Sequence, residues 1–160
     1  MARPAICSHC GSKGDLVTGK AIYPHRPDLS ALSFWQCVAC NAFVGCHKTG
    51  AKVPTKKGHI VSDGTLPLGT MANAELRRLR SLVHSTFDRY WRGEACWRLH
   101  PRFKPLSVPA RRKECYAWLS EALGITSEQC HIGLFTVNEC TKTLALVGNL
   151  PAPNLLDWKK

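Results

Sequence analysis

Apolar residues recur at intervals of three and four positions across one long segment, residues 72–91. These positions are Leu76, Leu79, Val83, Phe87 and Tyr90. The spacing places them on one face of a helix. Three arginines, Arg77, Arg78 and Arg89, point away from this apolar stripe, and Arg80 sits at its border. The pattern therefore predicts an amphipathic helix with basic side chains on its polar face.

The later part of the chain predicts further helices. One is expected to open near Pro109 and to end before Gly124, because proline suits a helix start and glycine suits the position just past its end. Residues 126–129 and residues 136–139 each have the form of a capping box. The second box predicts a helix that runs to Gly148. Three prolines interrupt residues 93–109, so no regular element is expected there.

The first 47 residues carry short apolar runs separated by turns that contain cysteine. Short antiparallel strands are expected at residues 15–23, 32–37 and 42–46. Residues 48–70 are rich in Gly, Lys, Pro and Thr and show no apolar period. This segment is therefore expected to be a basic flexible loop.

Two cysteine pairs in this part have the same internal spacing. Two residues separate Cys7 from Cys10 and Cys37 from Cys40, and 26 residues lie between the pairs. Each pair can supply two thiolates to one ion, and two pairs complete the tetrahedral shell that zinc prefers, with Zn–S distances of about 2.3 Å. Four protein ligands leave no position for water or substrate. The pattern therefore predicts one structural Zn²⁺ ion.

Other interpretations of these cysteines stay open. An iron–sulfur centre or a redox pair would use the same four thiols. Cys46 and His47 follow the second pair and could replace a ligand, although a place in the core or beside the ligands is the expected one. Gly11 and Asn41 follow the two pairs and suit the tight turns that back the sulfurs. His9 is expected to face solvent near the metal.

The remaining composition indicates a cytoplasmic globular protein. The hydrophobic fraction is 44%, and there are nine cysteines. An odd number argues against a complete disulfide framework. The chain reaches Cys7 with no room for a signal peptide, and no run of 18 apolar residues would span a membrane.

The net charge of +11 is distributed unevenly. Residues 1–113 hold 19 Lys and Arg against 6 Asp and Glu, whereas residues 114–160 hold 3 against 5. A surface that binds a polyanion concentrates one sign of charge, whereas a merely solvated surface mixes both. The residues expected to contact phosphates of DNA or RNA are Lys56, Lys57, Arg77, Arg78, Arg89, Arg92, Arg98, Arg102, Lys104, Arg111, Arg112 and Lys113. The alternative is a generally basic protein whose charges are only solvated.

Aromatic residues interleave with these cations. Trp91, Trp97 and Phe103 stand among the arginines, a composition that suits the stacking of bases from a single strand. Aromatic residues at such spacing more often belong to a core, so the charge argument does not depend on them.

An enzyme would need a catalytic set, and the candidates are few. His84 and Asp88 are four residues apart on one helix face, and Cys130 precedes His131. There is no Walker loop, dinucleotide fingerprint or nucleophile elbow, and the 11 acidic residues are scattered rather than clustered for Mg²⁺. We therefore expect no enzyme, with His84 on the surface and His131 beside the second helix. A metal-dependent nuclease is the enzymatic alternative.

Several blocks resemble known families. Residues 34–37 and 42–47 resemble the zinc ribbons at the C-terminus of bacterial type I topoisomerases. The "PLGT-x-AN-x-x-LR" block at residues 67–77 and the "HIG-x-F" block at residues 131–135 resemble the zinc-finger-containing domain family, over roughly residues 5–145. These are small proteins, mostly of phages and prophages, with no assigned activity. The resemblance implies a zinc-ribbon start and a phage or mobile-element origin, and hence the cytoplasm of a bacterial host cell.

One departure from that family is the separation of two blocks. The "GCH" block and the "PLGT" block lie close together in the family, whereas residues 48–66 separate them here. The insertion suggests that residues 48–66 have a function that other members of the family lack.

The sequence as a whole predicts an α+β protein. A four-cysteine zinc ribbon at residues 1–47 and the basic loop at 48–70 precede a helical domain of three to four helices at 71–150, and residues 151–160 form a tail. The expected function is nucleic-acid binding through the phosphate backbone. The alternative is a small phage-type inhibitor or subunit that binds a host nucleoprotein machine, such as a polymerase or a defence complex, through residues 114–150.

Overall fold

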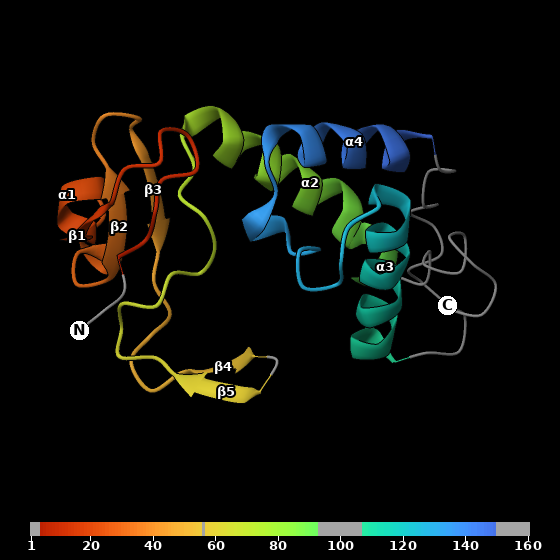
Figure 1. The fold of residues 1–160 in the computed structure, drawn as a ribbon, viewed down its shortest axis with the longest axis horizontal. Coiled ribbons are helices and arrows are strands. Elements are labelled where there is room, and N and C mark those ends of the chain that lie inside the picture. The colour runs from red at the N-terminus through yellow and green to blue at the C-terminus, as the bar shows by residue number, and fades with distance from the viewer. Residues whose placement is uncertain (1–3, 56, 93–106, 150–160) are drawn as a thin grey trace. The chain divides into compact units, whose positions relative to one another are not determined.

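The computed structural model describes residues 4–55, 57–92 and 107–149. The chain forms two compact units, Met1–Glu75 and Leu76–Lys160. The first unit contains all the described strands and one α-helical turn, and the regular structure described in the second unit is helical (Figure 1). The predicted combination of antiparallel strands and helices is confirmed.

A three-stranded antiparallel sheet forms the centre of the first unit. Its strands are β1 (Asp15–Thr18), β2 (Ser33–Cys37) and β3 (Ala42–Gly45), in the order β1-β2-β3. Leu16 pairs with Trp35, and Trp35 pairs with Val44. The central strand β2 is the most buried, which follows from its run of Phe34, Trp35 and Cys37.

The first predicted strand, residues 15–23, is too long. The chain leaves the sheet after Thr18 and forms one helical turn, α1 (Gly19–Ile22), followed by the 3-10 turn η1 (Pro27–Leu29). The backbone of Gly19 lies directly against the carbonyl of Leu29, and a Cβ atom would have no room there. The Gly19 N–H donates to the Leu32 carbonyl at 2.7 Å. This close approach turns the chain away from the strand.

Residues 48–70, predicted to be a basic flexible loop, contain regular structure that the sequence did not predict. Strands β4 (Lys52–Thr55) and β5 (Gly58–Val61) form an antiparallel hairpin. Val53 pairs with Ile60, so β-branched side chains stabilise the ladder across the strands. Pro54 within β4 hides the alternation that would have predicted a strand, since proline cannot donate a ladder hydrogen bond.

Three α-helices belong mainly to the second unit. They are α2 (Ala74–Arg92), α3 (Val108–Leu123) and α4 (Val137–Gly148), with the 3-10 turn η4 (Ile132–Leu134) before α4. Gly124 ends α3 in a left-handed conformation, with φ of 67°. None of the described helices is both long and apolar enough to cross a membrane.

The apolar stripe of α2 faces the core of the second unit, as the spacing predicts. Leu76, Val83, Phe87 and Tyr90 are buried, and Leu79 is half-buried. The largest fully buried side chains from the rest of this unit are Phe135, Leu119, Ile132, Thr143, Cys115 and Cys140. Cys115 and Cys140 are therefore core residues.

The two capping boxes have different outcomes. Thr136 accepts from the Glu139 N–H, and the Glu139 carboxylate accepts from the Thr136 N–H, so this box starts α4 as predicted. Thr126 and Gln129 form the same reciprocal pair of hydrogen bonds, but only a turn follows. The same pair of capping hydrogen bonds is therefore not sufficient to start a helix at residues 126–129.

Candidate metal centre and basic surface

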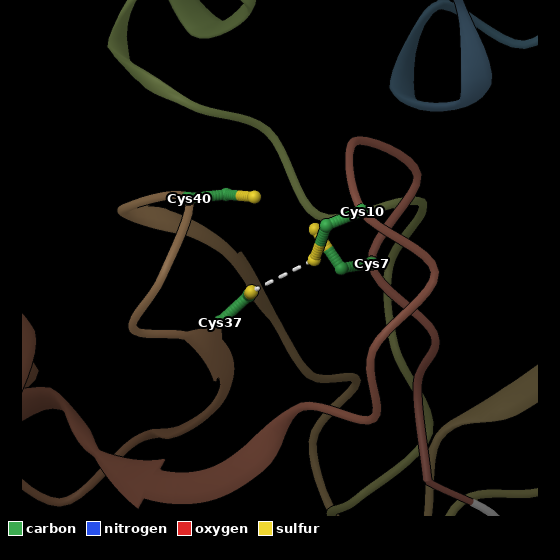
Figure 2. A group of neighbouring side chains, drawn as sticks. All are labelled: Cys7, Cys10, Cys37 and Cys40. Carbon is green, nitrogen blue, oxygen red and sulfur yellow. Dashed lines mark hydrogen bonds between the residues drawn. The ribbon is translucent and has the colours of Figure 1, made fainter.

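The four predicted ligands lie together. The sulfur atoms of Cys7, Cys10, Cys37 and Cys40 are all within 4.8 Å of one another. The Sγ atoms of Cys10 and Cys37 are 3.6 Å apart, as the dashed line in Figure 2 marks. One pair comes from the turn before β1, and the other comes from the end of β2 and the turn into β3. Two turns far apart in the sequence thus meet at one point.

The backbone of each turn suits a cysteine pair. The Gly11 N–H donates to the Cys7 carbonyl at 2.9 Å, and the Asn41 N–H donates to the Val38 carbonyl at 3.1 Å. Gly11 has φ of 74°, and Asn41 has φ of 47°. These left-handed conformations favour glycine and asparagine. The prediction that a small residue closes each turn is confirmed.

Hydrogen bonds set the protonation of the thiols unequally. The Ser12 hydroxyl and then the Ser12 backbone lower the pKa of Cys10 to about 6. A hydrogen bond with the Cys10 sulfur, together with desolvation, raises the pKa of Cys40 to about 12. At Cys37 a hydrogen bond with the Cys40 backbone lowers the pKa, but burial and the neighbouring thiols outweigh it and raise the pKa above its usual value. The pKa values of Cys10, Cys37 and Cys40 diverge in this way because neighbouring thiolates repel one another.

This donor set fits zinc. Four sulfur ligands in two short turns form the closed shell of a structural zinc site, and a bound cation lets every thiol ionise. Zinc bound here would join the two turns and hold the edge of the small sheet. Its four positions would all be filled by protein, so the site supplies stability rather than a reactive centre.

Cys46 lies outside this group of sulfurs. Its side chain packs against the core cluster that contains Trp35 and Met71. Burial raises the pKa of Cys46 to about 11, which keeps it a thiol. The His47 N–H donates to the Leu66 carbonyl at 2.7 Å. Of the two roles considered for Cys46, the core role is the one that the packing supports.

His9, inside the first turn, is also outside the group. Its Nε2 accepts from the Asn73 N–H at 3.4 Å, and Ser8 donates to the Met71 carbonyl at 3.1 Å. These contacts fasten the first cysteine turn to the segment that precedes α2.

A family model described as a zinc-finger-containing domain matches residues 3–150. The chain belongs to this family. The resemblance drawn from the "PLGT" and "HIG-x-F" blocks is confirmed, and the four-cysteine cluster agrees with it. No curated protein and no solved structure matches the chain. The family and the cluster together establish a zinc-binding protein with one structural zinc ion.

The predicted phosphate contacts of this zinc-finger-containing domain fall into separate places. Lys57 is exposed in the turn between β4 and β5 of the first unit. Arg78 is exposed and Arg77 is half-buried near the start of α2, about 18 Å along the helix from Arg89 at its other end. Lys56, Arg98, Arg102 and Lys104 lie outside the described residues, as do Trp97 and Phe103.

Five basic residues belong to the end of α2 and the start of α3. They are Arg89, Arg92, Arg111, Arg112 and Lys113. All are exposed except Arg111, which is half-buried and donates from Nε to the Trp91 carbonyl at 3.2 Å. The guanidinium carbons of Arg92 and Arg112 lie 5.1 and 5.5 Å from the centre of the Trp91 ring. Trp91 is therefore the point at which cations from two helices come together.

The Asp88 carboxylate accepts hydrogen bonds from both Trp91 and Arg92. This carboxylate is 12% exposed and accepts from the Trp91 Nε1–H at 3.0 Å and from Arg92 at 3.4 Å. His84 Nδ1 lies 3.3 Å from the same carboxylate, and the His84 side chain is 49% exposed. His84 is on the surface, as expected. The Asp88 carboxylate contacts Trp91 and Arg92 as well as His84.

Tyr116 on α3 is a further aromatic residue at this surface, which the sequence did not single out. It is half-buried, and its ring lies 5.4 Å from the Arg112 guanidinium. The Tyr116 ring also packs edge-on to Phe87, at 5.2 Å between ring centres. The signal was available, because Arg112 and Tyr116 are four residues apart and share a helix face.

Proposed function

We propose that this protein is a nucleic-acid-binding protein of phage or mobile-element origin that contacts the phosphate backbone of DNA or RNA. The zinc site is its structural support, and the basic surface is its binding surface. We name this surface the α2–α3 basic patch and define it as Arg89, Arg92, Arg111, Arg112 and Lys113.

The observation that carries the proposal is the gathering of Arg92 and Arg112 over one indole ring. Nineteen residues lie between them in the sequence, and folding brings their charges together. Such a concentration costs electrostatic repulsion, which a bound polyanion relieves. Asp88 offsets part of it but is itself nearly buried, so the exposed charge of the patch is positive.

The geometry of the patch suits phosphates. A guanidinium that stacks on an aromatic ring keeps its in-plane N–H groups for a bidentate contact with phosphate oxygens. Each phosphate that the patch neutralises releases counterions, which supplies affinity that does not depend on base sequence.

The test is binding of labelled DNA and RNA oligonucleotides at several salt concentrations. The triple variant Arg92→Gln, Arg112→Gln, Lys113→Gln should bind more weakly, and the slope of log affinity against log salt should fall by up to about 2 to 3. A control triple variant, Lys13→Gln, Lys20→Gln, Lys142→Gln, removes the same charge from exposed positions outside the patch. The slope of log affinity against log salt for this control should stay within about 1 of the wild-type slope.

Two results would overturn the proposal. One is the absence of oligonucleotide binding by the wild type at low salt. The other is an equal loss in both triple variants, which would mean that only net charge matters. That no catalytic activity accompanies binding stays a prediction.

A further inference from the structure

A pocket opens beside the α2–α3 basic patch. Its volume is about 280 Å³, and it is lined by Pro109, Arg112, Lys113, Tyr116, Cys130 and His131. The first four residues lie on α3, and the last two come directly after the turn at residues 127–129. Arg112 and Lys113 belong both to this pocket and to the patch. The pocket is thus continuous with the surface that we propose for phosphates.

The walls of the pocket combine two chemistries. Pro109, the Tyr116 ring and the buried side chain of Cys130 offer apolar and aromatic surface. Burial raises the pKa of Cys130 to about 11 and that of Tyr116 to about 12, so neither wall adds negative charge. Arg112 and Lys113 add positive charge at the rim, where both are exposed. A ligand that fits should have a flat apolar part next to an anionic part.

The aromatic wall is held in place before any ligand arrives. Arg92, Trp91, Arg112 and Tyr116 form a series of stacked contacts with separations of 5.1, 5.5 and 5.4 Å. Asp88 fixes one end through the Trp91 Nε1–H, and the fully buried Phe87 fixes the other end through the Tyr116 ring. Rotamers that are already fixed lose little entropy on binding.

The size of the pocket restricts the ligand further. Pockets for drug-sized molecules occupy about 300–1,000 Å³, so this one has room for a single ring system rather than for a peptide. A base in a duplex is stacked on both sides and paired at its edge. Only an unpaired base can present its flat face to a side chain.

We propose that this pocket takes one unpaired base of a single-stranded nucleic acid, with the adjoining phosphate on Arg112 and Lys113. The inference rests on the proposed function, and it restricts the expected ligand of the protein from nucleic acids in general to single-stranded nucleic acids. His131 lies at the same pocket, and its Nδ1 accepts from the Gly133 N–H at 3.2 Å.

The experiment compares a thymidine 12-mer with an abasic 12-mer of the same sugar-phosphate backbone and charge. The full-length zinc-bound protein should bind the thymidine strand more tightly than the abasic strand, and more tightly than a blunt duplex of equal length. Tyr116→Leu should lower the affinity for the thymidine strand more than the affinity for the abasic strand, so that the preference between them falls by about 5- to 100-fold. Tyr116→Phe keeps the ring and is the matched control, which should retain the preference.

A second measurement avoids any dependence on the folding of the Tyr116→Leu variant. In amide chemical-shift maps of the wild type, Lys113, Tyr116 and His131 should shift with the thymidine strand and much less with the abasic strand. Equal affinity for the two strands, or shifts that avoid these residues, would overturn the pocket while leaving the proposed function intact. If neither strand binds, the proposed function fails as well.

Discussion

At the scale of single residues, Cys37 and Cys46 provide a matched pair for testing the metal centre. Cys37→Ser should lower the zinc content well below one ion per chain, because a closed shell that loses one thiolate is incomplete. Cys46→Ala should keep its zinc, since this thiol lies outside the group of four sulfurs. Elemental analysis of the purified variants checks both. Unchanged zinc in Cys37→Ser, or lost zinc in Cys46→Ala, would contradict the ligand assignment.

The thiol protonation also predicts how zinc binding depends on pH. In the metal-free protein the pKa of Cys40 is about 12 and that of Cys37 is above its usual value, so both carry protons at pH 7. Zinc requires thiolates, so its binding displaces these protons, and acid favours the metal-free form. Zinc affinity should therefore fall as the pH is lowered.

Competition with a chelator across pH 6 to 8 measures this dependence. Calorimetry in buffers of different ionisation enthalpy should count more than one proton released per zinc at pH 7. A zinc affinity that does not change with pH would contradict the protonation assigned to Cys37 and Cys40.

At the scale of elements, the two capping boxes predict unequal effects on stability. Thr136→Ala should lower the free energy of unfolding by about 1 kcal/mol, because Thr136 caps α4 and its loss leaves backbone donors unpaired. Thr126→Ala is the matched control and should cost less, since Thr126 closes an exposed turn that starts no helix. Urea unfolding of both variants gives the comparison. Equal losses would mean that the box itself, rather than the helix after it, sets the effect.

At the scale of the whole molecule, the two compact units predict separate responses to loss of metal. The sheet of the first unit has a small core that includes the ligands Cys7 and Cys37 themselves. The second unit has its own core around Phe87, Leu119 and Phe135. Removing zinc with a chelator should therefore unfold the strands while the helices of the second unit keep their structure.

Hydrogen exchange resolved by peptide tests this expectation. After chelation, peptides from residues 5–47 should exchange much faster, whereas peptides from α3 and α4 should keep most of their protection. Equal loss of protection in both units would mean that they fold as one cooperative body.

The sequence alone determined the features that rest on local spacing. Cysteine pairs in two short turns identified the ligands, the three-and-four spacing identified α2, and the Thr136 box identified the start of α4. Each of these signals is complete within a short segment, and the two cysteine pairs repeat the same signal. A thiol pair, a helix face and a cap need no distant partner to be recognised.

Tertiary structure decided the features that depend on distant residues. The β4–β5 hairpin forms through pairing between two strands, one of which contains Pro54 and so lacks the usual sequence pattern of a strand. The chain leaves the first sheet at Gly19 because the Leu29 backbone lies against that residue. Residues 126–129 have the same capping bonds as the box at Thr136 but start no helix. Arg92 and Arg112 meet over Trp91 only because two helices pack together. Spacing along the chain cannot reveal such contacts, since each depends on the free energy of packing two separate segments.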